Sequence, residues 1–136
     1  MHQSLSTSHS RTLGFGDRLV SALDAGLRTV FAPTRAARPS PAASAPSTEL
    51  SAPHAREAGA LMRVNHVGEI CAQALYQSQA LFSHSDELRR HFEQAAEEEL
   101  DHLAWTAARV AELGTHTSRL APLWWAGAFA WGSAAG

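Results

Sequence analysis

The sequence predicts an all-α protein. Alanine is abundant, β-branched residues are few, and apolar residues recur with the 3.6-residue period of a helix. In one strongly helical stretch, Glu99 and His102 lie one turn apart, so both side chains point in the same direction. These observations predict a helical bundle with a carboxylate and an imidazole on one helix face.

Composition limits the classes of function. A chain of 136 residues can form one domain with a modest core. The formal net charge of −2 argues against a protein that binds nucleic acid through positive charge. The single cysteine, Cys71, excludes an internal disulfide. Residues 1–14 contain no continuous apolar run, so no secretory signal is predicted, but the Arg- and Ser-rich start would also suit a mitochondrial transit peptide.

The N-terminal third divides into three segments. Residues 1–14 are expected to be disordered, residues 15–32 to form an amphipathic helix, and residues 33–53, with five prolines, to form a linker. The helix carries an apolar stripe made of Leu19, Val20, Leu23, Leu27, Val30 and Phe31. Two interpretations of this helix remain open: it docks on the domain, or it rests on a membrane surface.

Residues 54–136 are expected to form a bundle of three helices, at 54–82, 86–113 and 122–136. Ser85 is a candidate N-cap and Gly114 a candidate C-terminal stop. The third helix has no charged residue. It concentrates four aromatic residues, Trp124, Trp125, Phe129 and Trp131. Such a helix is either central in a bundle or in contact with a membrane or an apolar substrate, and both interpretations remain open.

The Glu99–His102 pair is a candidate metal site. A helical wheel places Glu99 among apolar positions such as Leu103 and His102 at the edge of the same arc, whereas Glu97 and Asp101 are expected to face water. A buried carboxylate and imidazole are costly unless they are paired or bind a metal. The alternative is an acidic surface run with a histidine that is close by chance.

Glu69, in the preceding helix, strengthens the prediction of a metal site. Glu69 and Glu99 are each 15 residues from His84 at the predicted turn, so an antiparallel hairpin brings them to one level. Two carboxylates and an imidazole suit iron or manganese better than structural zinc. His66 and Tyr76 are candidates for a supporting shell around the ligands, although a core role is the preferred interpretation of both.

Two segments resemble the core helices of the demethoxyubiquinone hydroxylase family. Residues 61–76, LMRVNHVGEICAQALY, are similar to its first core helix, and residues 97–105, EEELDHLAW, to its second. Residues 121–125, APLWW, are similar to the opening of the third, so the resemblance covers about residues 56–136. It implies a ferritin-like di-iron helical bundle in which Glu69, Glu99 and His102 ligate iron.

The resemblance also implies an activity. Members of this family are monooxygenases of ubiquinone biosynthesis that hydroxylate the ring of a polyprenyl methoxy-benzoquinol, with O2 as co-substrate and a reductant that could be NADH. The implied partners are the quinol, other ubiquinone-biosynthesis proteins and a membrane. The implied location is peripheral, on the cytoplasmic face of the cell membrane, or on the mitochondrial inner membrane in a eukaryote.

The ligand set of the family is present only in part. Its members hold two iron ions with six ligands, and the later Glu and second Glu-x-x-His do not occur in this sequence. The sequence therefore looks like an N-terminal half, and we expect it to be inactive alone unless two copies of the hairpin complete the site. The alternatives are a ferritin- or rubrerythrin-like iron or peroxide protein, and a helical interaction protein without metal.

Overall fold

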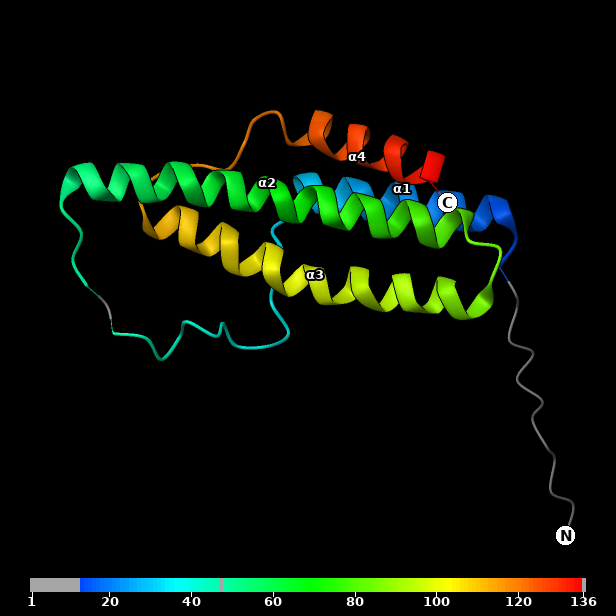
Figure 1. Cartoon of the computed structure of the whole chain (residues 1–136), viewed down its shortest axis with the longest axis horizontal. Coiled ribbons are helices and arrows are strands. Elements are labelled where there is room, and N and C mark those ends of the chain that lie inside the picture. The colour runs from blue at the N-terminus through cyan, green and yellow to red at the C-terminus, as the bar shows by residue number, and fades with distance from the viewer. Residues whose placement is uncertain (1–12, 47, 136) are drawn as a thin grey trace, which may run out of the picture.

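A computed structural model describes residues 13–46 and 48–135, and every regular element within these ranges is a helix. The all-α prediction is therefore confirmed. The helices are α1 (Phe15–Phe31), α2 (Ala52–Phe82), α3 (Asp86–Glu112) and α4 (Ala121–Ala135). In Figure 1, α2 and α3 run side by side as a long hairpin, and α1 and α4 lie along α2. The expected disorder of residues 1–12 concerns residues outside the described ranges.

The α2–α3 hairpin forms where the local sequence favours it. Pro53 lies in the first turn of α2, where its missing N–H leaves no intrahelical bond unmade. Ser85 caps α3, because its Oγ accepts a hydrogen bond from the Leu88 N–H at 3.3 Å. Gly114 follows α3 with a φ of 68°, which a residue with a Cβ adopts only at a cost. Ile70 and Leu103, both fully buried, join the two helices.

Helix α4 packs on α2 through small residues. A Cβ added at Gly132 would collide with Ser78 Oγ and would lie 3.3 Å from Leu75 Cα. The four aromatic residues of α4 do not share one surface. Trp125 packs against the core and stacks on Phe129, with 4.8 Å between the ring centroids, whereas Trp124 and Trp131 are 49% and 75% exposed.

Helix α1 docks through the face opposite most of its apolar stripe. Gly26 and Thr29 are buried, and a Cβ at Gly26 would collide with the Trp125 ring of α4. The residues of the stripe that are at least half exposed are Val20, Leu23, Leu27 and Phe31. The helix therefore docks on the domain and also presents an apolar face outward. Within the described residues, no helix is both long and apolar enough to cross a bilayer.

Candidate metal centre

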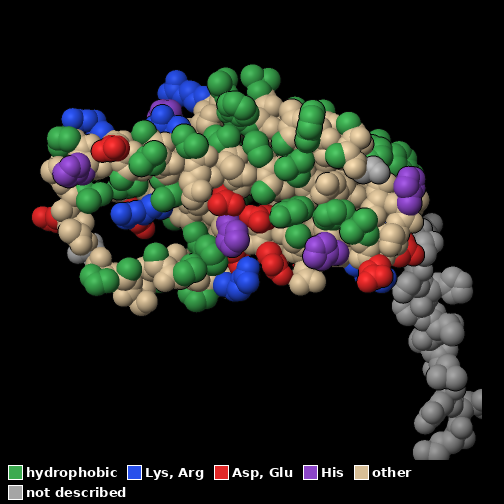
Figure 2. All heavy atoms as spheres, in the orientation of Figure 1, with side chains coloured by type: hydrophobic (Ala, Val, Ile, Leu, Met, Phe, Trp, Pro, Cys, Tyr) green, Lys and Arg blue, Asp and Glu red, His purple; other side chains and the backbone are tan. Residues whose placement is uncertain are grey.

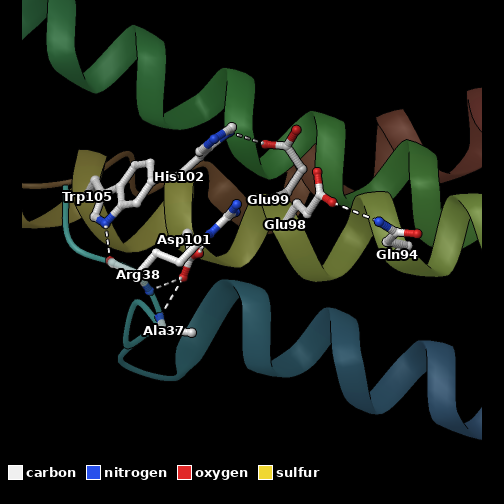
Figure 3. Close-up of polar contacts among 8 residues, drawn as sticks. All are labelled: Ala37, Arg38, Gln94, Glu98, Glu99, Asp101, His102 and Trp105. Atoms are coloured by element: carbon white, nitrogen blue, oxygen red, sulfur yellow. Dashed lines mark hydrogen bonds and ion pairs between the residues drawn. The ribbon is translucent and has the colours of Figure 1, made fainter. Parts of the chain in front are cut away.

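Glu69 of α2 meets Glu99 and His102 of α3 near the middle of the hairpin. One donor atom from each of the three side chains lies within 4.8 Å of the other two. His102 Nδ1 is 3.1 Å from Glu99 Oε2 and 3.9 Å from Glu69 Oε2. Figure 3 shows the His102 ring turned toward the Glu99 carboxylate on the same helix. Within the described residues, no other group of three such side chains comes this close.

The electrostatics of this cluster favour a cation. The Glu69 and Glu99 side chains are only 20% and 15% exposed, and His102 is 45% exposed. Burial, followed by the hydrogen bond with Glu99 and its charge, raises the pKa of Glu69 to about 7, against the weaker opposing effect of His102. Two carboxylates so close are hard to ionise together unless a positive charge sits between them. The donor set thus fits iron or manganese, and the ligand roles stay a prediction.

His66 forms a hydrogen bond in the core, as the preferred interpretation predicted. It is 6% exposed, and its Nδ1 lies 2.9 Å from Thr106 Oγ1. Thr106 Oγ1 also lies 2.8 Å from the His102 carbonyl oxygen and 3.1 Å from that of Leu103, and when its hydroxyl donates to one of them, His66 Nδ1–H donates to Thr106. Burial lowers the pKa of His66, which favours this neutral form. His66 therefore supports the backbone of the turn that carries His102.

Tyr76 has a packing role in this structure. Its ring stacks on Phe92 of α3, with 6.3 Å between centroids and 24° between planes. This contact joins the two helices between the candidate site and the hairpin turn. It agrees with the preferred core interpretation, and the supporting-shell role of Tyr76 stays untested.

The prediction that Asp101 faces water is wrong. Asp101 is 4% exposed because the linker crosses α3 and covers it. Its Oδ1 accepts from the Ala37 N–H at 2.6 Å, and its Oδ2 accepts from Arg38 Nε at 2.5 Å. The hydrogen bond with Arg38 lowers the pKa of Asp101. A helical wheel drawn for the hairpin alone does not include the linker and so cannot show this burial. Asp101 and Trp105, at positions i and i+4, lie on the same face of α3, and the linker covers that face.

Gln73 is another buried polar residue that the sequence did not single out. It lies one turn beyond Glu69, is 4% exposed, and its Oε1 has no hydrogen-bond partner among the described residues. A glutamine within a helix usually reaches solvent, so the sequence carries no signal for this burial. The unpartnered oxygen marks a polar position in the core close to the candidate ligands.

Residues 56–136 match the model of a family described as ubiquinone biosynthesis protein COQ7. The chain belongs to this family. Three proteins named 3-demethoxyubiquinol 3-hydroxylase illustrate the similarity. The one from Paracidovorax citrulli is 59% identical over 116 residues, 85% of this chain and 57% of that protein. The one from Nitrosomonas eutropha is 53% identical over 120 residues, 88% of this chain and 58% of that protein.

A third relative, from Methylibium petroleiphilum, is 53% identical over 127 residues, which is 93% of this chain and 60% of that protein. The chain therefore spans somewhat more than half the length of the COQ7 relatives it matches. No solved structure matches the chain significantly. The all-helical fold agrees with the ferritin-like bundle that the resemblance implied, and the relatives' names do not favour an iron-storage or peroxide protein.

Proposed function

We propose that this chain supplies part of a di-iron 3-demethoxyubiquinol 3-hydroxylase, which hydroxylates the ring of a polyprenyl methoxy-benzoquinol in ubiquinone biosynthesis. Membership of the COQ7 family and the names of the relatives support this proposal. The observation that carries it is the convergence of Glu69, Glu99 and His102 from two facing helices. O2 would be the co-substrate and NADH a candidate reductant.

Each residue of the site has a distinct role in this proposal. Glu69 and Glu99 would offer carboxylate oxygens to iron from opposite helices, and His102 would offer a ring nitrogen. Iron bound there would supply the O2 chemistry that no side chain of the site can perform alone. In the metal-free chain Glu69 retains its proton up to a pH of about 7, so binding of a divalent cation at lower pH would release that proton.

A metal titration tests the ligand roles. Fe2+ under anaerobic conditions, or Co2+ followed by its visible absorption, is added to the full chain and to Glu69→Gln, Glu99→Gln and His102→Gln. Each substitution should weaken binding at least about tenfold, because each removes one donor. Glu97→Gln is the matched control, since Glu97 is exposed on the same helix. Equal binding by the parent chain and by all three variants would show that the cluster is not the metal site.

A chimera tests the activity. The 120 aligned residues of this chain replace the corresponding segment of the Nitrosomonas eutropha relative, and the product is expressed in a bacterium that lacks its own hydroxylase. We expect the chimera to restore ubiquinone, measured in lipid extracts. The same chimera with Glu99→Gln should accumulate the demethoxy precursor, whereas the Glu97→Gln control should not. A folded chimera that restores no ubiquinone would contradict the proposal for this chain.

We further propose that the protein is peripheral to a membrane, on the cytoplasmic face of the cell membrane. A polyprenyl quinol dissolves in lipid, and α1 and α4 both expose apolar side chains. The candidate contacts on α4 are Trp124 and Trp131, because Trp125 and Phe129 stack on each other and Trp125 packs against the core. Figure 2 shows hydrophobic side chains gathered over α4 on the visible face of the molecule, and acidic and histidine side chains nearer the middle of that face.

Liposome flotation tests the membrane contact. The variant Trp124→Ser/Trp131→Ser should float with vesicles of mixed neutral and anionic lipid less than the parent chain, because exposed Trp favours the lipid–water interface. Leu88→Ser is the control, since Leu88 is also exposed but lies on α3, away from α4. Flotation that is unchanged in the double variant would remove α4 from the proposed contact.

A further inference from the structure

The Pro-rich linker makes its principal described polar contacts with α3 at the turn that carries the candidate ligands. Ala37 and Arg38 both contact Asp101, which lies between Glu99 and His102 in sequence. Arg38 is half exposed, but the Asp101 side chain is only 6% exposed, so one side of the ion pair is shielded from water. An ion pair with a desolvated partner fixes geometry more firmly than a fully exposed pair.

A second contact extends this link toward His102. The Trp105 Nε1–H donates to the backbone carbonyl of Arg38 at 3.1 Å. The Trp105 ring lies against His102, with 5.3 Å between ring centroids and 42° between planes. Figure 3 shows the linker residues on one side of α3, with Trp105 between Arg38 and the His102 ring. Arg38, Asp101 and Trp105 together are called the linker latch below.

The latch contacts the side chain of His102, whereas His66 and Thr106 support only its backbone. The His102 side chain is 45% exposed, and its only described polar partners are the Glu99 and Glu69 carboxylates, which are themselves candidate ligands. Trp105 is the aromatic neighbour that restricts the ring. A metal ligand that is already oriented loses less side-chain freedom on binding, so the affinity for metal rises.

From these contacts we infer that the linker latch is a positioning device for His102: Arg38 holds Asp101 and Trp105, and Trp105 holds the imidazole in its ligating orientation. The inference deepens the proposed metal centre and rests on it. It gives residues 37–38, outside the hairpin and outside the matched segment 56–136, a part in building the site. No latch residue belongs to the candidate ligand group of Glu69, Glu99 and His102.

The orientation of His102 can be measured without metal. In the full chain, NMR should show nuclear Overhauser contacts between the His102 ring protons and the Trp105 indole protons. Arg38→Ala and Asp101→Ala should weaken them severalfold, and Arg38→Lys should retain most of the signal because the charge is kept. Arg109→Ala is the matched control, since Arg109 forms an exposed ion pair with Glu112 on the same helix. If the alanine variants do not fold, Asp101→Asn removes the charge with little change of shape.

Co2+ affinity then shows whether orientation matters for binding. Loss of the latch should weaken Co2+ binding about tenfold, the lower end of the effect of removing a ligand's supporting partner. Unchanged ring contacts in the latch variants, or weakened contacts with unchanged affinity, would overturn the inference. If the parent chain binds no Co2+, the proposed metal centre fails in this chain, whereas the ring contacts still decide whether the latch orients His102.

Discussion

The α2–α3 hairpin and the α1–α4 pair differ in how many polar residues they bury and how many apolar residues they expose. The hairpin buries polar residues, among them His66, Gln73, Gln77, Asp101 and Thr106. Helices α1 and α4 expose large apolar side chains, such as Leu27, Leu123 and Trp131, and they do so more often than the longer hairpin, where Leu61 and Val64 are exposed. Both arrangements cost stability in a protein that only has to fold in water. The buried polar residues of the hairpin agree with a polar site there, and the exposed apolar side chains of α1 and α4 form the surface for which we propose a membrane contact.

Truncating one leucine in each region should give the largest difference. Leu103 is 1% exposed in the hairpin core, whereas Leu123 of α4 is 68% exposed. Leu103→Ala should lower the free energy of unfolding by about 3 kcal/mol through lost burial and an unfilled cavity. Leu123→Ala should change it by less than about 0.5 kcal/mol. Chemical denaturation measures both free energies. Similar losses of stability in the two variants would contradict the proposed difference between the hairpin core and the surface of α4.

The contact of α4 with α2 should be the next most sensitive feature. Gly132→Ala places a methyl group against Ser78 and the backbone of Leu75, so it should destabilise the chain by about 1–3 kcal/mol. Gly127, in the same helix, has no atom within 4 Å of an added Cβ. Gly127→Ala should therefore stabilise the chain by about 0.5–1 kcal/mol. Thermal unfolding of the two variants compares them, and a shift in the same direction for both would mean that α4 does not pack closely here.

The buried carboxyl of Glu69 should make the metal-free hairpin sensitive to pH. Its pKa rises from 4.5 in the unfolded chain to about 7 in the fold, so between these values only the folded chain keeps the proton. The contribution of Glu69 to stability should therefore fall as pH rises from about 4.5 to about 7, by about 1–2 kcal/mol once screening of a partly exposed group is allowed for.

Glu69→Gln should remove this part of the dependence of stability on pH, because the amide does not ionise. Denaturation of the metal-free chain at several pH values measures it. The control Glu97→Gln, exposed on α3, should keep the parent's profile in this range. If Glu69→Gln left the parent's dependence of stability on pH unchanged, the carboxyl would be better solvated than its burial indicates.

The smallest effect on stability is expected at the exposed aromatic side chains of α4. Trp131 is 75% exposed, so Trp131→Ser should change the free energy of unfolding by no more than about 0.5 kcal/mol. Trp125→Ala should cost severalfold more, since Trp125 fills the space between α1, α2 and α4. Equal losses of unfolding free energy in chemical denaturation would mean that the aromatic residues of α4 are not divided into a buried and an exposed group.

Much of the hairpin follows from local chemistry. The pairing of Glu69 with Glu99 depends on the helical period and on the turn at residues 83–85, and the structure brings both to His102 as the spacing predicted. The family could likewise be recognised from the sequence, because residues 61–76 and 97–105 carry its pattern within two helices. Whether the three side chains ligate metal is still a prediction.

Other features depend on contacts between segments far apart in the chain. The sequence identified the apolar stripe of α1 but could not decide which face docks, because Gly26 became a contact only when Trp125 of α4 was placed against it. A helical wheel places Asp101 toward water because the wheel considers only the residues of its own helix. The burial of Asp101 requires residues 37–38, more than 60 positions away, to cross α3. Local periodicity thus determined the helices and the meeting of the acidic residues, and tertiary packing decided which polar residues are buried and which linker residues contact α3 beside His102.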